Sequence, residues 1–119
     1  MEEMTGGPRH VQVQTAAGSA AEADAIAAAL LAGRLAACVQ VVGPMRSRYR
    51  WQGRVESTEE WLCIVKTTAV AAGAAMTEIA RVHSYETPEI TVTPIVAGAP
   101  SYLAWIDEMV ATPGIDPGP

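Results

Sequence analysis

Phenylalanine is absent from this chain, and its aromatic residues are three tryptophans and three tyrosines. Leu, Ile, Val and Met must therefore supply most of the bulky packing, because much of the remaining hydrophobic content is alanine. A chain of 119 residues has room for one domain with a modest core. Burying more apolar surface against copies of the same chain is one way to stabilise such a domain.

Basic residues are few: eight lysines and arginines stand against thirteen acidic residues, which gives a net charge of −5. Phosphate binding needs a basic surface, so the composition argues against a nucleic-acid partner. Half of the basic residues are nevertheless clustered, at Arg46, Arg48, Arg50 and Arg54. This cluster is either a local anion site or a solvated, ion-paired face of a sheet.

Long apolar segments are also missing. No run is long enough to cross a bilayer, and the alanine-rich stretch 16–32 contains Glu22 and Asp24 where the core of a signal peptide would be apolar. The two cysteines, Cys38 and Cys63, lie in apolar segments without CxxC spacing. We expect a cytoplasmic protein with reduced thiols and no membrane partner.

Motifs of common enzymes are absent too. The sequence has no Ser-His-Asp spacing, no glycine-rich phosphate loop and no zinc-protease motif. Cys38 and His83 are a possible nucleophile and base, but no oxyanion site accompanies them. The sequence therefore predicts a protein that is not an enzyme.

Hydrophobic periodicity predicts four strands and three helices. The strands are expected at 10–15, at 35–43 continuing through 45–51, at 54–67 and at 89–96, and the helices at 20–34, 70–82 and 102–110. The order β-α-β-β-α-β with a short C-terminal helix is the ferredoxin-like split βαβ pattern of the α+β class. Glycines and prolines predict a flexible N-terminal arm over 1–9 and a flexible tail over 112–119, around one domain at 10–111.

Local signals refine the first helix. Ser19 and Glu22 have the spacing of a capping box, which places the start of the helix. Ile26, Leu30 and Leu31 are expected to form its inward stripe.

The second strand and its return are the most informative part of the sequence. The nearly continuous apolar run over 35–43 predicts a central strand, and Gly43 with Pro44 predicts a bend or bulge. Gln52 and Gly53 then predict a tight turn. Because the resulting hairpin is too long and polar to lie over one small core, and because bare strand edges are usually covered, we predict that its arms mediate oligomerisation. Pro94 predicts an edge position or a bulge for the last strand.

Five segments carry a resemblance to a known family. They are LAACV at 35–39, YRWQG at 49–53, VKTT at 65–68, HSYETPEI at 83–90 and YLAWI at 102–106. In order and spacing they resemble the CutA1 family of divalent-cation tolerance proteins over about residues 10–111. The resemblance implies a homotrimer of ferredoxin-like subunits, similar in architecture to the PII signalling proteins. It also implies an association with tolerance or binding of divalent metals, copper especially.

The copper ligands proposed for bacterial members of that family are a cysteine that ends the first strand and a pair of histidines before the tyrosine-containing loop. The matching positions here hold Thr15, Val82 and His83, so His83 alone has the expected identity. Ser84 stands where the family usually has proline.

The candidate metal ligands of this chain are His83, Glu86 and Cys38, because imidazole, carboxylate and thiolate groups bind divalent metals. A single histidine with carboxylates selects copper poorly, so we expect copper or another divalent cation to bind weakly. The alternative is structural: His83 bonds locally, Glu86 is solvated, and Cys38 packs as a small apolar residue.

A second group of side chains could line a pocket between subunits. Its members are Tyr49, Trp51, Lys66, Tyr85, Glu89 and Trp105. Lys66 or an arginine would hold an anionic ligand there. Alternatively, the aromatic rings pack a trimer interface and Lys66 pairs with a glutamate.

Three functional hypotheses follow. The first is a homotrimeric binding protein associated with divalent-metal tolerance or response, with its ligand site at subunit interfaces. The second is a PII-like signalling module that binds a small anionic metabolite and relays it to a partner through the hairpin. The third is a trimeric scaffold for a partner protein that the sequence does not identify.

Overall fold

The computed structural model describes residues 7–111, whose elements follow the predicted order. The strands are β1 His10–Ala17, β2 Cys38–Trp51, β3 Arg54–Thr68 and β4 Ile90–Pro94, and the helices are α1 Ala20–Ala32, α2 Ala72–Val82 and α3 Pro100–Met109. The predicted tail and most of the predicted N-terminal arm lie outside the described residues.

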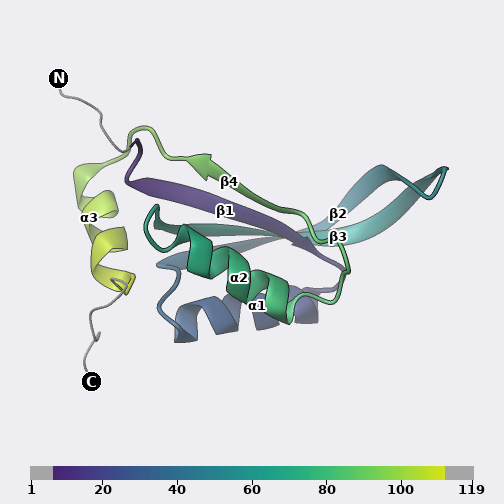
Figure 1. Ribbon diagram of the computed structural model, residues 1–119, viewed down its shortest axis with the longest axis horizontal. Coiled ribbons are helices and arrows are strands. Elements are labelled where there is room, and N and C mark those ends of the chain that lie inside the picture. The colour runs from purple at the N-terminus through teal and green to yellow at the C-terminus, as the bar shows by residue number, and fades with distance from the viewer. Residues whose placement is uncertain (1–6, 112–119) are drawn as a thin grey trace.

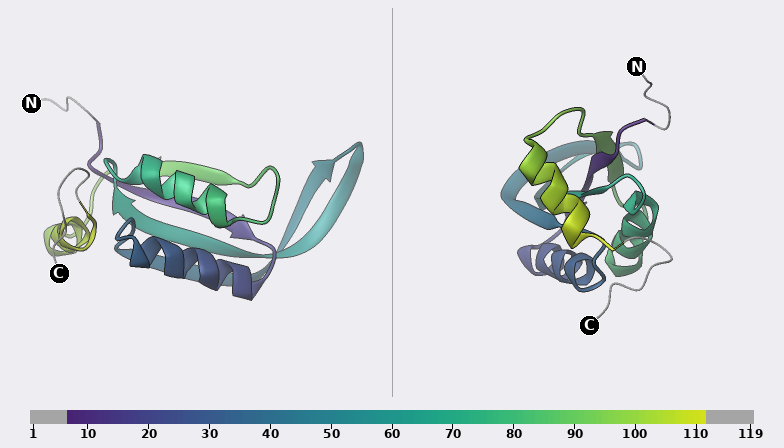
Figure 2. Two further views of the ribbon diagram at one scale, coloured as in Figure 1. Left: turned by 60° about the horizontal axis from the view of Figure 1, so that its bottom comes forward. Right: turned by 90° about the vertical axis from the view of Figure 1, so that its left-hand side faces the viewer.

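The four strands form one antiparallel sheet in the order β2-β3-β1-β4, which is the ferredoxin-like arrangement predicted from the element order. Helices α1 and α2 cover one face of this sheet, and the β2–β3 hairpin extends well beyond the body of the molecule (Figure 1). Helix α3 lies at the end of the body that is farther from the hairpin tip (Figures 1 and 2).

The core lies between the sheet and the two helices. Val13 of β1 and Val65 of β3 pair with each other and are fully buried, as are Ile26 of α1 and Ile79 of α2. Because side chains alternate along a strand, the neighbours of these core residues point to the opposite, helix-free face. The domain therefore has one covered and one uncovered sheet face.

Strand β2 corrects the sequence prediction. The apolar run over 35–43 predicted a central strand, but β2 is an edge strand, and the central positions belong to β3 and β1. Val41 and Val42 of β2 are consequently 38% and 53% exposed. An apolar run indicates a surface that tends to be buried, but it does not say whether the same chain buries it. At the other edge of the sheet lies β4, which contains Pro94, so the edge position that this proline predicted is confirmed.

The start of α1 follows its capping signal. Ser19 is the N-cap, and its Oγ accepts a hydrogen bond from the Glu22 N–H at 3.0 Å. Ile26 and Leu30 are buried as predicted, but Leu31 is 46% exposed, so its predicted place on the inward stripe is wrong. One residue further along an α-helix turns the side chain by about 100° and carries it off the buried face.

Helix α3 is tied to the body by polar contacts as well as by packing. The Arg34 guanidinium donates to the carbonyl oxygens of Met109 and Glu108 at 3.2 and 3.0 Å, which satisfies the free end of the helix. His10 Nε2 lies 2.9 Å from Asp107 Oδ1. These contacts fix α3 far from the hairpin.

The hairpin turn and its bulge lie where the sequence predicted them. Gln52 and Gly53 have φ values of 49° and 79°, which is the left-handed geometry of a tight hairpin turn. The strand register shifts between Val42 and Met45. Glycine is required at Gly43 in this bulge, because a Cβ there would lie 2.4 Å from the indole ring of Trp61.

Candidate functional site

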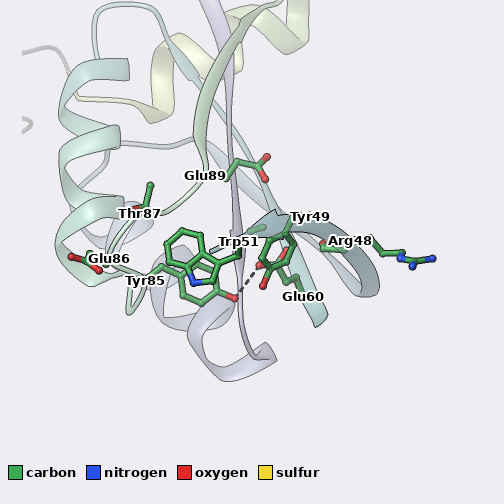
Figure 3. Close-up of a pocket in the computed structure, with 10 residues that line it drawn as sticks. Arg48, Tyr49, Trp51, Glu60, Tyr85, Glu86, Thr87 and Glu89 are labelled. Atoms are coloured by element: carbon green, nitrogen blue, oxygen red, sulfur yellow. Dashed lines mark hydrogen bonds between the residues drawn. The ribbon is translucent and has the colours of Figure 1, made fainter. Parts of the chain in front are cut away.

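A hollow of about 590 Å³ lies between the curved β2–β3 hairpin and the loop that connects α2 to β4. We call it the hairpin hollow. It is lined by Ala16, Ser47, Arg48, Tyr49, Trp51, Glu60, Tyr85, Glu86, Thr87 and Glu89 (Figure 3). Three of these residues are aromatic and three are glutamates, so the hollow combines apolar rings with negative charge.

The strand register explains why these side chains meet. The tight turn pairs Trp51 with Arg54 and Tyr49 with Glu56, and the bulge brings Met45 opposite Glu60. Because every second residue of a strand points to the same face, Tyr49, Trp51 and Glu60 all face the hairpin hollow. A one-residue change in register would move all of them to the other face.

Tyr85 and Glu60 form the central polar contact of the hollow. The Tyr85 hydroxyl donates a hydrogen bond to Glu60 Oε2 at 2.9 Å, and Glu60 is only 8% exposed. Burial, together with this hydrogen bond to a carboxylate, raises the pKa of Tyr85 to about 12. The hydroxyl therefore remains a proton donor at neutral pH. Gly18 allows this placement, because a Cβ at that position would lie 3.0 Å from the Tyr85 oxygen.

The three aromatic rings of the hollow remain accessible. Tyr49, Trp51 and Tyr85 are between 38% and 47% exposed. In Figure 3 their rings gather near the Glu60 carboxylate, while the Arg48 guanidinium points away from them. The inner part of the hollow is therefore aromatic and acidic.

His83 anchors the loop between α2 and β4 to strand β1. Its side chain is fully buried, Nε2 lies 2.9 Å from the Ala16 carbonyl oxygen, and Nδ1 accepts a hydrogen bond from the Tyr85 N–H at 3.1 Å. This pairing requires Nε2 to carry the proton, because a carbonyl oxygen only accepts. Both ring nitrogens are thus used to hold the loop against β1, and a metal would have to displace one of these bonds.

Glu22 anchors the same loop from the start of α1. Its carboxylate accepts hydrogen bonds from the Ser84 N–H at 2.6 Å, from the Ser84 hydroxyl at 3.1 Å and from the Gly18 N–H at 3.3 Å. Burial alone would raise the pKa of Glu22, but these hydrogen bonds outweigh burial and lower it. Ser84 thereby supplies two donors, its backbone N–H and its hydroxyl.

The three predicted metal ligands do not converge within one chain. Cys38 begins β2 level with Lys66 and Gln12, whereas His83 bonds to Ala16, four residues further along β1. At about 3.3 Å per residue this separates Cys38 from His83 by at least about 13 Å. Glu86 lines the hairpin hollow on the His83 side. Among residues 7–111, no three His, Cys, Asp or Glu side chains are grouped so that they could hold a metal ion.

Two members of the predicted pocket lie elsewhere. Lys66 Nζ donates to Gln40 Oε1 at 2.9 Å, so its partner is a glutamine instead of the glutamate considered from the sequence. Trp105 lies on α3 with its ring 5.6 Å from that of Tyr102, at the end of the body away from the hairpin. The other four predicted pocket residues do line the hairpin hollow: Tyr49, Trp51, Tyr85 and Glu89.

Sequence reasoning missed Glu60, the buried carboxylate at the centre of the hollow. A signal was available, since the predicted turn at 52–53 and the bulge at Gly43 together fix which residues of the returning strand share a face with Tyr49 and Trp51. The approach of the 83–90 loop to this strand is a tertiary contact that periodicity does not report.

A sequence model of the CutA1 divalent ion tolerance protein family matches residues 11–109. The chain belongs to the CutA1 family. It is 40% identical over 101 residues to the divalent-cation tolerance protein CutA of Archaeoglobus fulgidus, covering 85% of this chain and 98% of that protein. It is 44% identical over 86 residues to the CutA of Thermus thermophilus, covering 72% of this chain and 84% of that protein.

Solved structures of CutA proteins agree with this fold. CutA from Xylella fastidiosa matches with a TM-score of 0.85 at 34% identity, covering 87% of this chain and 99% of that one. A protein of Archaeoglobus fulgidus described as a periplasmic divalent cation tolerance protein matches with a TM-score of 0.83 at 39% identity, covering 86% and 99% of the two chains. The predicted CutA1 membership and the ferredoxin-like fold are therefore confirmed. No helix within residues 7–111 of this CutA1 chain is long and apolar enough to cross a membrane.

Proposed function

We propose that this CutA1 chain is a homotrimeric binding protein that takes part in divalent-cation tolerance and catalyses no reaction. Its family membership supports the link to divalent-cation tolerance. The main support for a homotrimer is the apolar surface that one chain leaves uncovered on its sheet. Leu62 and Ile64 alternate with the buried Cys63 and Val65 of β3, so they point to the face without helices, where they are only partly buried.

The edges of the sheet support assembly as well. β2 and β4 each have a neighbouring strand on one side only, and β2 carries the exposed Val41 and Val42 along its edge. An exposed apolar edge strand tends to pair with another chain. Copies of the same chain arranged around a closed symmetry axis would cover these edges and the open sheet face together.

The proposed metal site lies between copies and uses Cys38, His83 and Glu86. The separation of Cys38 from the other two within one chain means that a second copy must supply it. Cys38 starts an edge strand and is only partly buried, so a neighbouring copy can reach it. Glu86 is exposed, whereas His83 would have to give up its bond to the Tyr85 N–H in order to bind a metal. We expect the resulting affinity for copper to be weak.

Calorimetric titration of the assembled protein with Cu²⁺ and with Zn²⁺ tests this site. Cys38→Ser and Glu86→Gln should each weaken Cu²⁺ binding about tenfold or more, and His83→Ala should weaken it less, because the histidine is already bonded in the fold. Glu108→Gln on α3 is the matched control and should leave the isotherm unchanged. If all four isotherms coincide with that of the unaltered protein, the interface metal site is wrong.

A small anionic metabolite is the second candidate ligand, as in a PII-like module. The lining of the hairpin hollow disfavours an anion, because it contains three glutamates (Glu60, Glu86 and Glu89) and one arginine, Arg48. A thermal-shift screen of nucleotides and organic acids should therefore produce no stabilisation. A clear stabilisation by any anion in that panel would favour the signalling function over metal tolerance.

We also propose a cytoplasmic location. Both cysteines are free, which suits a reducing compartment. Cell fractionation tests this proposal: the chain should be recovered with the cytoplasmic fraction, and recovery from another compartment would contradict it.

A further inference from the structure

The inner wall of the hairpin hollow places a buried carboxylate among aromatic rings. Glu60 is 8% exposed, and the hydrogen bond that its carboxylate accepts comes from the neutral hydroxyl of Tyr85. Within residues 7–111, Arg81 pairs with Glu78, and the rings of His10 and His83 lie within 4 Å of the carboxylates of Asp107 and Glu22; none of these contacts includes Glu60. A buried carboxylate is costly unless a positive group compensates it. Glu60 therefore presents to the hollow a carboxylate that no described cationic side chain pairs with.

The rings beside Glu60 add a second requirement on the ligand. Trp51, Tyr49 and Tyr85 are each about half exposed and border the same space, so their faces are available to a guest. The face of an aromatic ring attracts a cation, most strongly for tryptophan. A volume of about 590 Å³ lies in the ordinary range for small-molecule sites. Rings and carboxylate together favour a positive, partly apolar guest.

A metal ion and an anion both fit this wall poorly. No three ligating side chains are grouped for a metal among the described residues, and aromatic faces do not replace the oxygen ligands that a hard cation prefers. An anion would meet Glu60 at the centre of the wall, while the Arg48 guanidinium points away (Figure 3). An ammonium group with carbon substituents satisfies the carboxylate and the rings at once.

We propose that the hairpin hollow binds a small organic ammonium ion, with Glu60 balancing its charge and with Trp51, Tyr49 and Tyr85 enclosing its carbon substituents. This proposal does not depend on the proposed Cys38–His83–Glu86 metal site, although Glu86 also lines the hollow. The Tyr85 hydroxyl holds the Glu60 carboxylate in position, and His83 and Glu22 hold the loop that carries Tyr85.

The test uses choline and its neutral carbon analogue, 3,3-dimethylbutan-1-ol, which have nearly the same shape and differ in charge. Calorimetric titration of the full-length protein, free of added metal, should show saturable binding of choline, and the neutral analogue should bind at least about tenfold more weakly. Equal affinity for the two compounds would overturn the proposal. So would the absence of saturation by choline, tetramethylammonium and butylamine up to about 10 mM.

Paired variants locate the binding. Glu60→Gln should weaken choline binding at least about tenfold, while Glu59→Gln, the exposed neighbour on the opposite face of the strand, should change it less than about twofold. Trp51→Leu should weaken binding to a similar extent, and Trp105→Leu on α3 should not. Circular dichroism and thermal unfolding establish that each variant is folded.

Trp51→Leu also protects the test against a folding defect in Glu60→Gln. Because Trp51 is 47% exposed, its replacement leaves the core unchanged, so a folded protein is expected even if the buried Glu60 tolerates no substitution. Retained choline affinity in Trp51→Leu would overturn the site by itself. Unchanged metal titration in the same variant would show that the two proposed sites are distinct.

Discussion

Replacing Glu22 with glutamine should destabilise the fold and loosen the loop that carries Tyr85. The carboxylate accepts three hydrogen bonds, two from Ser84 and one from Gly18, and its side chain is 15% exposed. Glutamine retains one acceptor oxygen and places an amide donor where the second oxygen stood. One backbone N–H then faces another donor, and the remaining bonds lose their charge assistance.

The expected cost follows from these contacts. A hydrogen bond to a charged group contributes about 1.5–3 kcal/mol, and a neutral one about 1 kcal/mol. Because the Glu22→Gln variant keeps at least one neutral bond to Ser84, we expect a loss of about 1–2 kcal/mol in the free energy of unfolding. The helix start itself should persist, since the Ser19 Oγ accepts from the backbone N–H of residue 22 in either variant.

The pH dependence identifies the carboxylate as the cause. Burial raises the pKa of Glu22 in the folded chain, but the hydrogen bonds that it accepts from Ser84 and Gly18 lower it by more, so the net pKa is lowered. The unfolded chain therefore binds this proton more readily, and the stabilisation is present at neutral pH and lost as the pH falls through the pKa of folded Glu22. The difference between the two proteins should shrink below about pH 4.

Urea denaturation at fixed protein concentration, repeated from pH 7 to pH 3, is the assay. Glu78→Gln is the matched control, because Glu78 forms a solvent-exposed pair with Arg81 on α2, whose loss should lower the free energy of unfolding much less than Glu22→Gln does. If Glu22→Gln is as stable as the unaltered protein at pH 7, the loop is not held by this carboxylate. A difference that stays constant down to pH 3 would show that some other property of the side chain is responsible.

Two further predictions concern packing and thiol chemistry. Gly43→Ala should lower the free energy of unfolding by about 1–3 kcal/mol, because the new Cβ would lie 2.4 Å from the Trp61 ring. Gly73→Ala, which has open space around it near the start of α2, should raise the free energy of unfolding by about 0.5 kcal/mol. Equal midpoints of the two variants in urea would contradict both predictions. A disulfide reagent at pH 8 should modify the partly exposed Cys38 and leave the buried Cys63 unmodified. Burial raises the pKa of the Cys63 thiol to about 11, so little thiolate forms there. Rapid reaction of two thiols per native chain would contradict this prediction.

The fold was predictable because local signals agree along this chain. The alternating strands, the Ser19 cap and the turn at Gln52 and Gly53 each depend on neighbouring residues, and the structure places them as expected. The central position predicted for β2 was wrong, because the hydrophobic run at its start measures a tendency to be buried and not the order of strands. Leu31 was wrong for a related reason: near the end of a helix rich in alanine the boundary of the apolar stripe is poorly defined.

The site was predictable only in part. Tyr49, Trp51, Tyr85 and Glu89 were identified because they lie in the segments that resemble CutA1 proteins, and all four line the hairpin hollow. Glu60 was missed, since its importance arises from the Tyr85 hydroxyl, 25 residues away in the sequence. The bonds of both His83 ring nitrogens are likewise long-range or loop-specific contacts that no sequence pattern encodes.

The proposed function depends most directly on assembly, and the mass of the native protein measures it. Native mass spectrometry of the 12.5 kDa chain, at submicromolar concentration and with and without Cu²⁺, should give a species of three times the chain mass in both conditions. A folded protein with the mass of one chain would contradict the account, because the exposed β2 edge and the open sheet face would then need no second copy, and Cys38 could not meet Glu86.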